Sequence, residues 1–420
     1  MKAVKNLTLR FYIAVLIYFL ISCTLGALLA TRLIYRVFPN AMMGLAHAHL
    51  ALVGWVSMVI VGSIYQIVPV LLGTGLDNES LGNYQFWIMN VGVVGIFIGF
   101  LTANMGVVSL FGAVLAFSLY LFAYIIYRTI RRRNVGIGLA MKFFIAAIVY
   151  ILVSSTFGVL MASGTARALL SKGYLRLAHG HLALVGWVTL TIMGAMYQML
   201  PMLSLKELYS EKIGEIQFWT ANIGVVGLFI SLVTGHSIRS VQFKTFAFIL
   251  VASVLLFTFD MFMTLLAKDK KAEKMDITLK YYATAIVYLT VSCLLGVSLA
   301  IFPSIRVGNI GLAHAHLALV GFVSITIMGA MYHLVPLLVW TEKYASRMGT
   351  EAVPTIKDLY SERLGIGIFW MINIAVVGFF LALVASSQTA LIVFAVLLLI
   401  TSYLFSFEML GIIFRKEMSL

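Results

Sequence analysis

The sequence predicts an all-α polytopic membrane protein with twelve transmembrane helices, arranged as three pseudo-threefold repeats of four helices. Three observations predict this class. First, 62% of the 420 residues are hydrophobic, only 10% are charged, and the mean hydropathy is +1.05. Second, apolar runs of about 20 residues, the length that spans a bilayer, recur along the whole chain. Third, the same motifs return three times, which indicates an internal repeat.

Four motifs define each repeat. A segment of the type FYIAVLIY is followed by a His-x-His pair, then by Tyr-x-x-x-Pro, and then by Phe-Trp-x-x-Asn. The first histidines of the pairs are 132 and 135 residues apart, whereas the Phe-Trp motifs are 132 and 151 apart. A polar insertion near 341–356 in the third repeat explains the longer spacing. We expect one membrane domain, 1–420, made of repeats 1–133, 134–275 and 276–420.

The apolar runs give the order of the elements. The first run has no convincing signal-peptidase site and is matched by helices later in the chain, so we interpret it as a retained span. The expected spans are 9–31, 45–72, 84–105, 107–128, 142–164, 177–203, 216–236, 243–267, 280–302, 312–340, 367–386 and 389–414.

Basic residues predict the orientation, because cytoplasmic loops carry an excess of Lys and Arg. With both termini in the cytoplasm, the clusters at 128–133 and 268–274 and most of the 29 Lys and Arg residues are cytoplasmic. We expect an integral protein of a prokaryotic cytoplasmic membrane, with the lipid bilayer as its surroundings. The net charge of +14 then reflects topology, and no nucleic acid is expected as a partner.

Six of the eight histidines lie in the three His-x-His pairs. Such residues are costly in lipid, so they usually face the protein interior and bind something. Residues two apart on a helix point about 200° apart at similar depth. Each pair therefore gives one ligand to each of two neighbouring sectors of the bundle. The candidates are His47, His49, His179, His181, His314 and His316.

Haem is the natural occupant of such a sector, because its iron accepts one imidazole on each face. A copper ion held by two histidines alone would be under-coordinated. Two other interpretations stay open. The histidines could be buried residues hydrogen-bonded to Ser, Thr or backbone, or only some of the three copies could bind a ligand.

Twelve spans with histidines on spans two, six and ten resemble the catalytic subunit of haem–copper oxidases and nitric-oxide reductases. In motif the resemblance is strongest at His314-x-His316. It implies that His316 and His47 (or His49) hold a low-spin haem and that His314 holds a second haem. It also implies that His179 or His181 corresponds to the span-six ligand of the second metal.

The sequence departs from that family in two places. A His-His pair is expected at the outer end of span seven, but only His236 is present. The cross-linked tyrosine of many oxidases is absent, since Ala183 and Val185 stand four residues after the two histidines of span six. The resemblance thus implies two b-type haems and an altered site for copper or non-haem iron. The triplicated pairs permit a third haem between repeats one and two.

The resemblance implies an oxidoreductase subunit that either reduces oxygen or nitric oxide or passes electrons from a quinol or cytochrome c partner, and it allows companion subunits. The alternative is a non-catalytic membrane protein that senses, stores or transports haem, copper or nitric oxide. The sequence has no CxxCH motif, so covalently attached haem c is not expected.

Other polar residues have two interpretations each. Arg32, Arg167 and Arg306 recur near the outer end of each first span, and Arg176 precedes His179 by three residues. These arginines could bind haem propionates or anchor the chain at the interface.

Two carboxylates, Asp260 and Glu408, lie at corresponding places near the inner ends of spans eight and twelve. We expect each to pair with Lys or Arg, with a proton path or a quinone contact as the alternative. One glycine follows each histidine pair, and its missing side chain would let a porphyrin or a helix approach closely. These glycines are Gly54, Gly186 and Gly321.

Overall fold

The computed structural model describes the whole chain except residues 1, 40, 171–172, 268–274, 306–308 and 416–420. Within the described residues, 12 helices are long and apolar enough to cross a membrane. Their bounds fall within a few residues of the predicted spans, so the predicted fold class is confirmed. The basic cluster at 268–274 and Arg306 lie outside the described residues.

The helices follow the same order in each repeat. The first repeat contains α1 (Lys2–Ala30), α2 (Ile34–Val37), α3 (Met43–His49), η1 (Leu50–Ser57), α4 (Met58–Leu71), α5 (Glu79–Leu101) and α6 (Met105–Arg131). The second contains α7 (Leu139–Ala162), α8 (Thr165–Leu169), α9 (Leu175–His181), η2 (Leu182–Thr189), α10 (Leu190–Ser204), α11 (Glu211–Val233) and α12 (Val241–Leu266).

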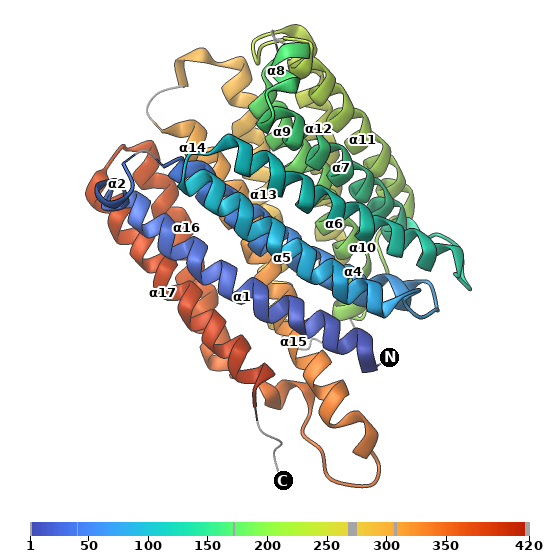
Figure 1. Ribbon diagram of the computed structural model, residues 1–420. Coiled ribbons are helices and arrows are strands. Elements are labelled where there is room, and N and C mark those ends of the chain that lie inside the picture. Colours follow the sequence, from blue (N-terminus) through green and yellow to red (C-terminus); the bar gives the residue numbers. More distant parts are fainter. Residues whose placement is uncertain (1, 40, 171–172, 268–274, 306–308, 416–420) are drawn as a thin grey trace.

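The third repeat adds short helices in its insertion. It contains α13 (Ile277–Ile301), η3 (Pro303–Ile305), α14 (Ile310–His316), η4 (Leu317–Ser324), α15 (Ile325–Lys343), η5 (Ala345–Arg347), η6 (Ile356–Leu359), α16 (Glu362–Val384) and α17 (Gln388–Ile413). The end of the bundle where α2, α8 and η3 link the first two spans of each repeat is called the histidine face. The opposite end, where α1 begins and α17 ends, is called the terminal face (Figure 1).

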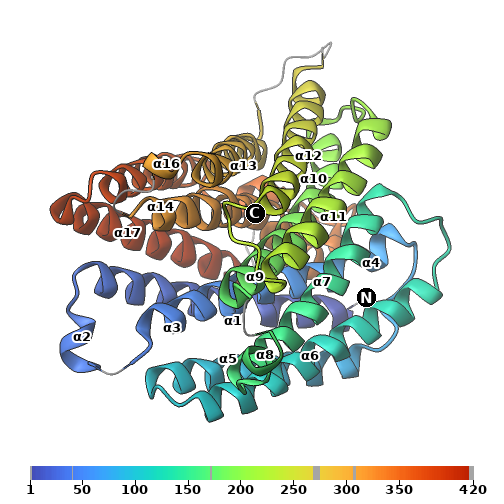
Figure 2. The same ribbon diagram turned by 90° about the horizontal axis from the view of Figure 1, so that it is seen from above.

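The second span of each repeat lies at the centre of the bundle. In the most apolar windows of these spans 67, 72 and 83% of the residues are buried, compared with 28–50% in the other described spans. Seen from above, the three repeats occupy three sectors around this centre: blue to teal, green to yellow, and orange to red (Figure 2). The central helices therefore meet all three repeats, which is where shared sites can form.

The last two spans of each repeat pack closely because a glycine on one faces a phenylalanine on the other. A Cβ built on Gly95, Gly227 or Gly378 would lie 2.0, 2.0 or 2.1 Å from the ring of Phe111, Phe246 or Phe394. Any side chain there would separate the two helices. Small residues at such contacts let transmembrane helices approach closely.

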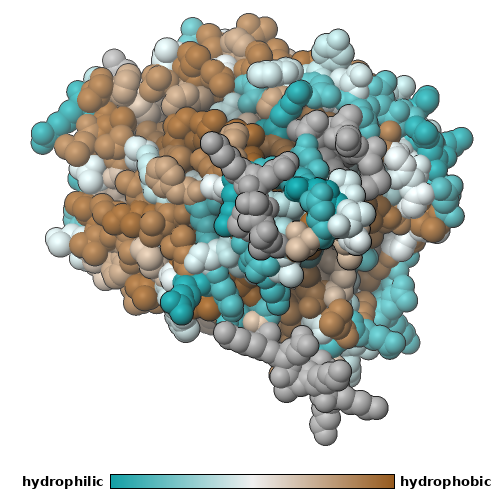
Figure 3. Space-filling model, turned by 90° about the horizontal axis from the view of Figure 1, so that it is seen from below, coloured by the Kyte–Doolittle hydropathy of each residue, from teal (hydrophilic) through white to brown (hydrophobic). Residues whose placement is uncertain are grey.

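The outer surface carries large apolar side chains, as a lipid-facing surface requires. Trp87, Trp219 and Trp370 hold equivalent positions in the three repeats and are 62, 62 and 61% exposed. Viewed from below, hydrophobic residues cover much of the periphery, and hydrophilic residues gather around the centre of this end of the molecule (Figure 3). An integral membrane protein shows this distribution.

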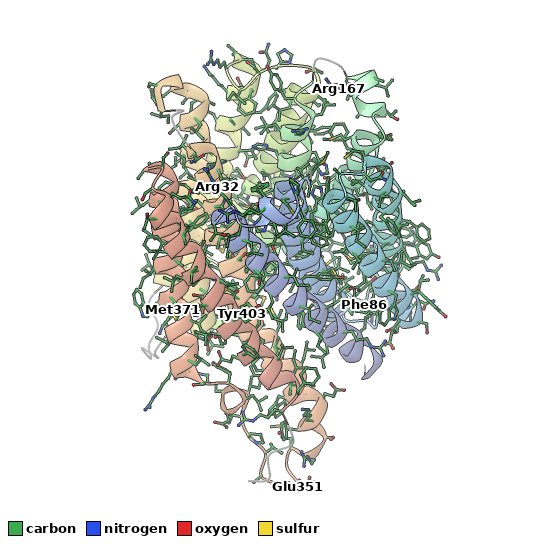
Figure 4. The ribbon with its side chains drawn as sticks, turned by 60° about the vertical axis from the view of Figure 1, so that its left-hand side comes forward. Arg32, Phe86, Arg167, Glu351, Met371 and Tyr403 are labelled. Atoms are coloured by element: carbon green, nitrogen blue, oxygen red, sulfur yellow. The ribbon has the colours of Figure 1, made fainter. Side chains whose placement is uncertain are left out.

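The insertion of the third repeat lies at the terminal face, with Glu351 at its tip (Figure 4). The Trp340 indole donates a hydrogen bond to Pro354 O at 2.6 Å. Arg415 donates to the carbonyls of Asp358 and Leu359 at 3.1 and 3.2 Å, which ties the insertion to the end of α17. Hydrogen bonds from the hydroxyl and backbone N–H of Thr355 hold the pKa of the Asp358 carboxyl below its usual range.

Candidate functional site: a layer of paired histidines

The six paired histidines lie near the histidine face, where they end the short helices α3, α9 and α14. In each helix the second histidine is the last residue, and the first lies two residues earlier. All six residues are partly exposed, although the surrounding helices are apolar.

A π-helical segment of eight residues follows each histidine pair: η1, η2 and η4. The apolar pattern of these spans predicts continuous α-helices and gives no sign of the π-helical segments. π-Helices are rare and occur mostly as single turns, frequently at functional sites. The last residue of each segment uses its hydroxyl to bond the carbonyl five residues earlier. These bonds are Ser57 to Leu52 (2.8 Å), Thr189 to Leu184 (2.9 Å) and Ser324 to Leu319 (3.0 Å).

The glycine of each π segment faces a tyrosine ring of the first span. A Cβ on Gly54 would lie 2.9 Å from Cγ of Tyr18, and Gly186 and Gly321 stand in the same relation to Tyr150 and Tyr288, at 2.8 and 2.9 Å. Of the two interpretations of these glycines, the structure shows close helix packing.

The first histidine of each pair is held by the first span of its own repeat. Nδ1 of His47 donates to Ser22 O at 3.1 Å. His179 and His314 contact serine hydroxyls through Nδ1, at 3.4 Å from Ser154 and 3.3 Å from Ser292.

A glycine four residues after each of these serines lies against the imidazole ring. A Cβ on Gly26, Gly158 or Gly296 would lie 3.0, 3.0 or 2.9 Å from Cε1 of the histidine. The motif Ser-x-x-x-Gly in the first span is thus part of the site. The sequence analysis missed it, although its recurrence in all three repeats was visible.

The second histidine of each pair is oriented by its own helix. Its Nδ1 donates to the carbonyl four residues earlier, at 2.9 Å for His49, 2.9 Å for His181 and 3.0 Å for His316. The ring of His49 packs on Phe100 and that of His316 on Phe379, with ring centroids 4.7 and 5.1 Å apart.

The histidines meet across the boundaries between repeats. The second histidine of one repeat interacts electrostatically with the first histidine of the next: His49 with His179, His181 with His314, and His316 with His47. The sequence left open which histidine of each pair faces which neighbouring repeat, and the structure places the second histidine of each repeat beside the first histidine of the next. Each sector between two repeats thus contains two imidazoles from different helices.

The bonds at Nδ1 determine what these imidazoles can do. A ring that donates through Nδ1 carries its free lone pair on Nε2, the form in which histidine binds a metal. Metal-binding histidines almost always donate their other N–H to a carbonyl, carboxylate or water. His47, His49, His181 and His316 have such a bond to a backbone carbonyl.

His236 does not join the pairs. It lies beyond the end of α11, where its Nδ1 contacts the Thr234 hydroxyl at 3.0 Å. The start of α9 is fixed beside that end by a bond from Tyr174 N to Leu232 O (2.9 Å). His181 lies seven residues further along α9, about 10 Å deeper. Among the described residues, no three His, Cys, Asp or Glu side chains form a group that could hold a metal ion.

Three of the four candidate arginines are described by the structure, and they lie on the histidine-face side of the histidines. Arg32, Arg167 and Arg176 are exposed, and Figure 4 shows Arg32 and Arg167 toward the end opposite Glu351. Arg176 and His179 are three residues apart on α9, so they share one side of that helix. Both interpretations of the arginines, as propionate partners and as interfacial anchors, stay open.

Asp260 and Glu408 have partners that the sequence analysis did not predict. Within the described part of the chain neither carboxylate pairs with Lys or Arg, and each accepts a hydrogen bond from the backbone N–H of a helix N-cap residue. These are Ser210 for Asp260 and Ser361 for Glu408, both at 3.1 Å. Glu408 also accepts a bond from the Tyr332 hydroxyl at 2.6 Å. The carboxylates therefore fasten the start of one helix to the next helix.

A hydrogen-bonded contact joins the repeats below the histidines. The Trp187 indole donates to the Ser57 hydroxyl at 3.0 Å, and the Trp55 indole donates to the Ser324 hydroxyl at 3.3 Å. The equivalent position in repeat three is Phe322, which has no N–H to donate to Thr189. Two of the three boundaries therefore have this bond.

The comparisons with known proteins agree with this architecture. The family model described as cytochrome c and quinol oxidase polypeptide I matches residues 1–109, 102–240 and 234–392. A solved structure of a haem–copper terminal oxidase dimer is similar with a TM-score of 0.73 and 13% identity, over 99% of this chain and 85% of that one. At that identity the likeness shows the fold alone.

Two sequence relatives are more limited guides. An uncharacterised protein of Aquifex aeolicus (strain VF5) is 26% identical over 312 residues, which are 74% of this chain and 75% of the relative. The cbb3-type cytochrome c oxidase subunit CcoN1 of Stutzerimonas stutzeri is 29% identical over 87 residues, only 20% of this chain and 18% of that subunit.

Proposed function

Because the chain belongs to the cytochrome c and quinol oxidase polypeptide I family, we propose that it is a membrane electron-transfer protein that holds b-type haems between the histidines of neighbouring repeats. One observation carries this proposal. The histidines pair across repeat boundaries, and hydrogen bonds at Nδ1 leave Nε2 free for a metal.

The donor set fits haem. Two imidazoles from opposite sides complete the coordination of an iron whose other four ligands come from the porphyrin. His47 with His316 would hold one haem, and His181 with His314 a second. A small apolar cavity borders His316 and is lined by Phe379 and Leu398.

Bound haem supplies a reversible one-electron couple. The residues of the chain fix the two imidazoles, surround them with apolar helices, and leave the arginines of the histidine face available to the propionates. If both imidazoles of a sector bound one iron, no coordination position would be left for oxygen or nitric oxide, so we propose electron transfer without reduction of either gas. A quinol or a cytochrome c would supply the electrons, and companion subunits would receive them.

Optical spectroscopy on the purified protein tests this proposal. We expect a reduced spectrum with the sharp visible bands of low-spin haem b, and no change when carbon monoxide is added to the reduced sample. A carbon monoxide shift would reveal an open iron and favour an oxygen or nitric-oxide reductase. Protein purified from haem-replete cells that contains no haem would overturn the proposal, and metal analysis of the same sample would detect copper.

A further inference from the structure

We propose that His49 and His179, at the boundary between repeats one and two, form a third bis-histidine haem site. This inference rests on the proposed function, since it assumes that the other pairs bind haem. It adds a site for which the resemblance to oxidases gives no counterpart. The protein would then carry three haems at one depth around its pseudo-threefold axis.

The first argument is the separation of the two rings. Their centroids are 6.4 Å apart and their planes differ by only 16°. Imidazoles joined by a direct hydrogen bond would have centroids about 5 Å apart, because the nitrogens approach to about 3 Å. Imidazoles on either side of one metal have centroids about 6 Å apart, because each nitrogen lies about 2 Å from the metal. The observed spacing is too long for a direct hydrogen bond and leaves room for a metal between the rings.

The second argument is that this pair is built like the other two. His49 donates through Nδ1 to Leu45 O at 2.9 Å. His179 contacts the Ser154 hydroxyl through Nδ1 at 3.4 Å and lies against Gly158. A π segment follows each of the two histidines, as it follows every pair. The scaffold that orients the imidazoles is therefore as complete here as in the other two sectors.

The third argument concerns the kind of ligand. Among the described residues, no further His, Cys, Asp or Glu joins this pair to form a metal-binding group of three. A bare copper or zinc ion would have only two protein ligands, whereas both metals prefer more. Haem brings four nitrogen ligands of its own and needs two imidazoles on opposite faces. The pair therefore suits haem better than a bare ion.

Haem counting tests the inference directly. We expect about three haem b per polypeptide in the purified wild-type protein, measured by pyridine haemochromogen and amino-acid analysis. The double variant His49→Ala/His179→Ala should keep two thirds of that haem. The matched variant His47→Ala/His316→Ala should also keep two thirds, because it removes one other sector.

The outcomes separate this inference from the proposed function. Wild-type protein with two haems, unchanged in the His49→Ala/His179→Ala variant, overturns the third site and leaves the proposed function standing. Wild-type protein with no haem overturns both. If that variant does not fold, a potentiometric titration of the wild-type protein decides. Three one-electron components support the third site, and two contradict it.

Discussion

In the histidine layer, which comprises the three histidine pairs with their serines and glycines, equivalent residues of the three repeats make nearly the same contacts. The tyrosine layer comprises Tyr65, Tyr197 and Tyr332 with their neighbours and lies nearer the terminal face. In this layer the tyrosine hydroxyl has a different partner in each repeat. Tyr65 donates to Gln85 at 3.3 Å and Tyr332 donates to Glu408 at 2.6 Å. The Tyr197 hydroxyl is buried beside Asp260, the carboxylate of repeat two that corresponds to Glu408.

This difference indicates which residues bind a ligand, because contacts that are the same in all three repeats point to a function that the repeats share. A tyrosine that only packs helices together can exchange its partner between repeats, because any acceptor of suitable size satisfies its hydroxyl. A histidine that holds one side of a shared ligand must keep its depth and orientation, because the opposite side comes from another repeat. The uniform layer is therefore the candidate site, and the varied layer is scaffold.

The largest expected effect is a difference in haem content between a variant of His316 and a variant of His333, which follows Tyr332 in the same span. Replacing His316 by Ala should abolish haem binding in its sector, because one of the two axial imidazoles is lost. Replacing His333 in the tyrosine layer should leave the haem content unchanged. Reduced-minus-oxidised spectra of both purified variants check this. Equal haem loss in the two variants would contradict the division into layers.

The second prediction concerns the glycine beneath an imidazole. Gly26→Ala would place a Cβ 3.0 Å from Cε1 of His47 and should displace the ring. We expect haem affinity in that sector to fall about 10- to 100-fold, as when the groups that orient metal ligands are changed. Gly44→Ala is the control, because a Cβ there would meet no atom within 4 Å. Haem retention during dilution and competition with apomyoglobin would measure the difference.

A smaller effect is expected from the serine that orients His314. Ser292→Ala removes the hydroxyl that lies 3.3 Å from Nδ1, so the ring loses an orienting contact. Haem affinity should fall about tenfold. Ser298→Ala on the same helix removes only a bond to its own helix carbonyl (2.8 Å to Leu294 O) and serves as the control. Indistinguishable affinities for the two variants would show that the Ser292 contact does not orient His314.

The smallest effect belongs to the tyrosine layer. Tyr332→Phe removes the bond to Glu408 and should lower the free energy of unfolding by about 0.6 kcal/mol, the average for interhelical hydrogen bonds in a membrane protein. The haem spectrum should not change. Denaturation in detergent and an optical spectrum of the same variant measure both quantities. A changed spectrum would link the two layers and weaken the comparison.

Much of the fold could be predicted because hydropathy and repetition are local signals. Run length predicted the spans, and recurrence predicted which residues are equivalent. The π segments gave no such signal, because their residues are as apolar as those of an α-helical span and only the hydrogen bonding differs. The partners of Asp260 and Glu408 were missed because N-cap backbone groups far away in sequence supply the bonds.

The sequence by itself determined that six histidines lie at one depth in three equivalent helices, since the motif, its spacing and the helix geometry require it. It did not determine which histidines meet. The two histidines of a pair are two residues apart on a helix and therefore face opposite sides. Either one could face the preceding repeat, and the sequence is compatible with both arrangements. Packing of the repeats around the axis decides between them and places His316 beside His47, His49 beside His179 and His181 beside His314.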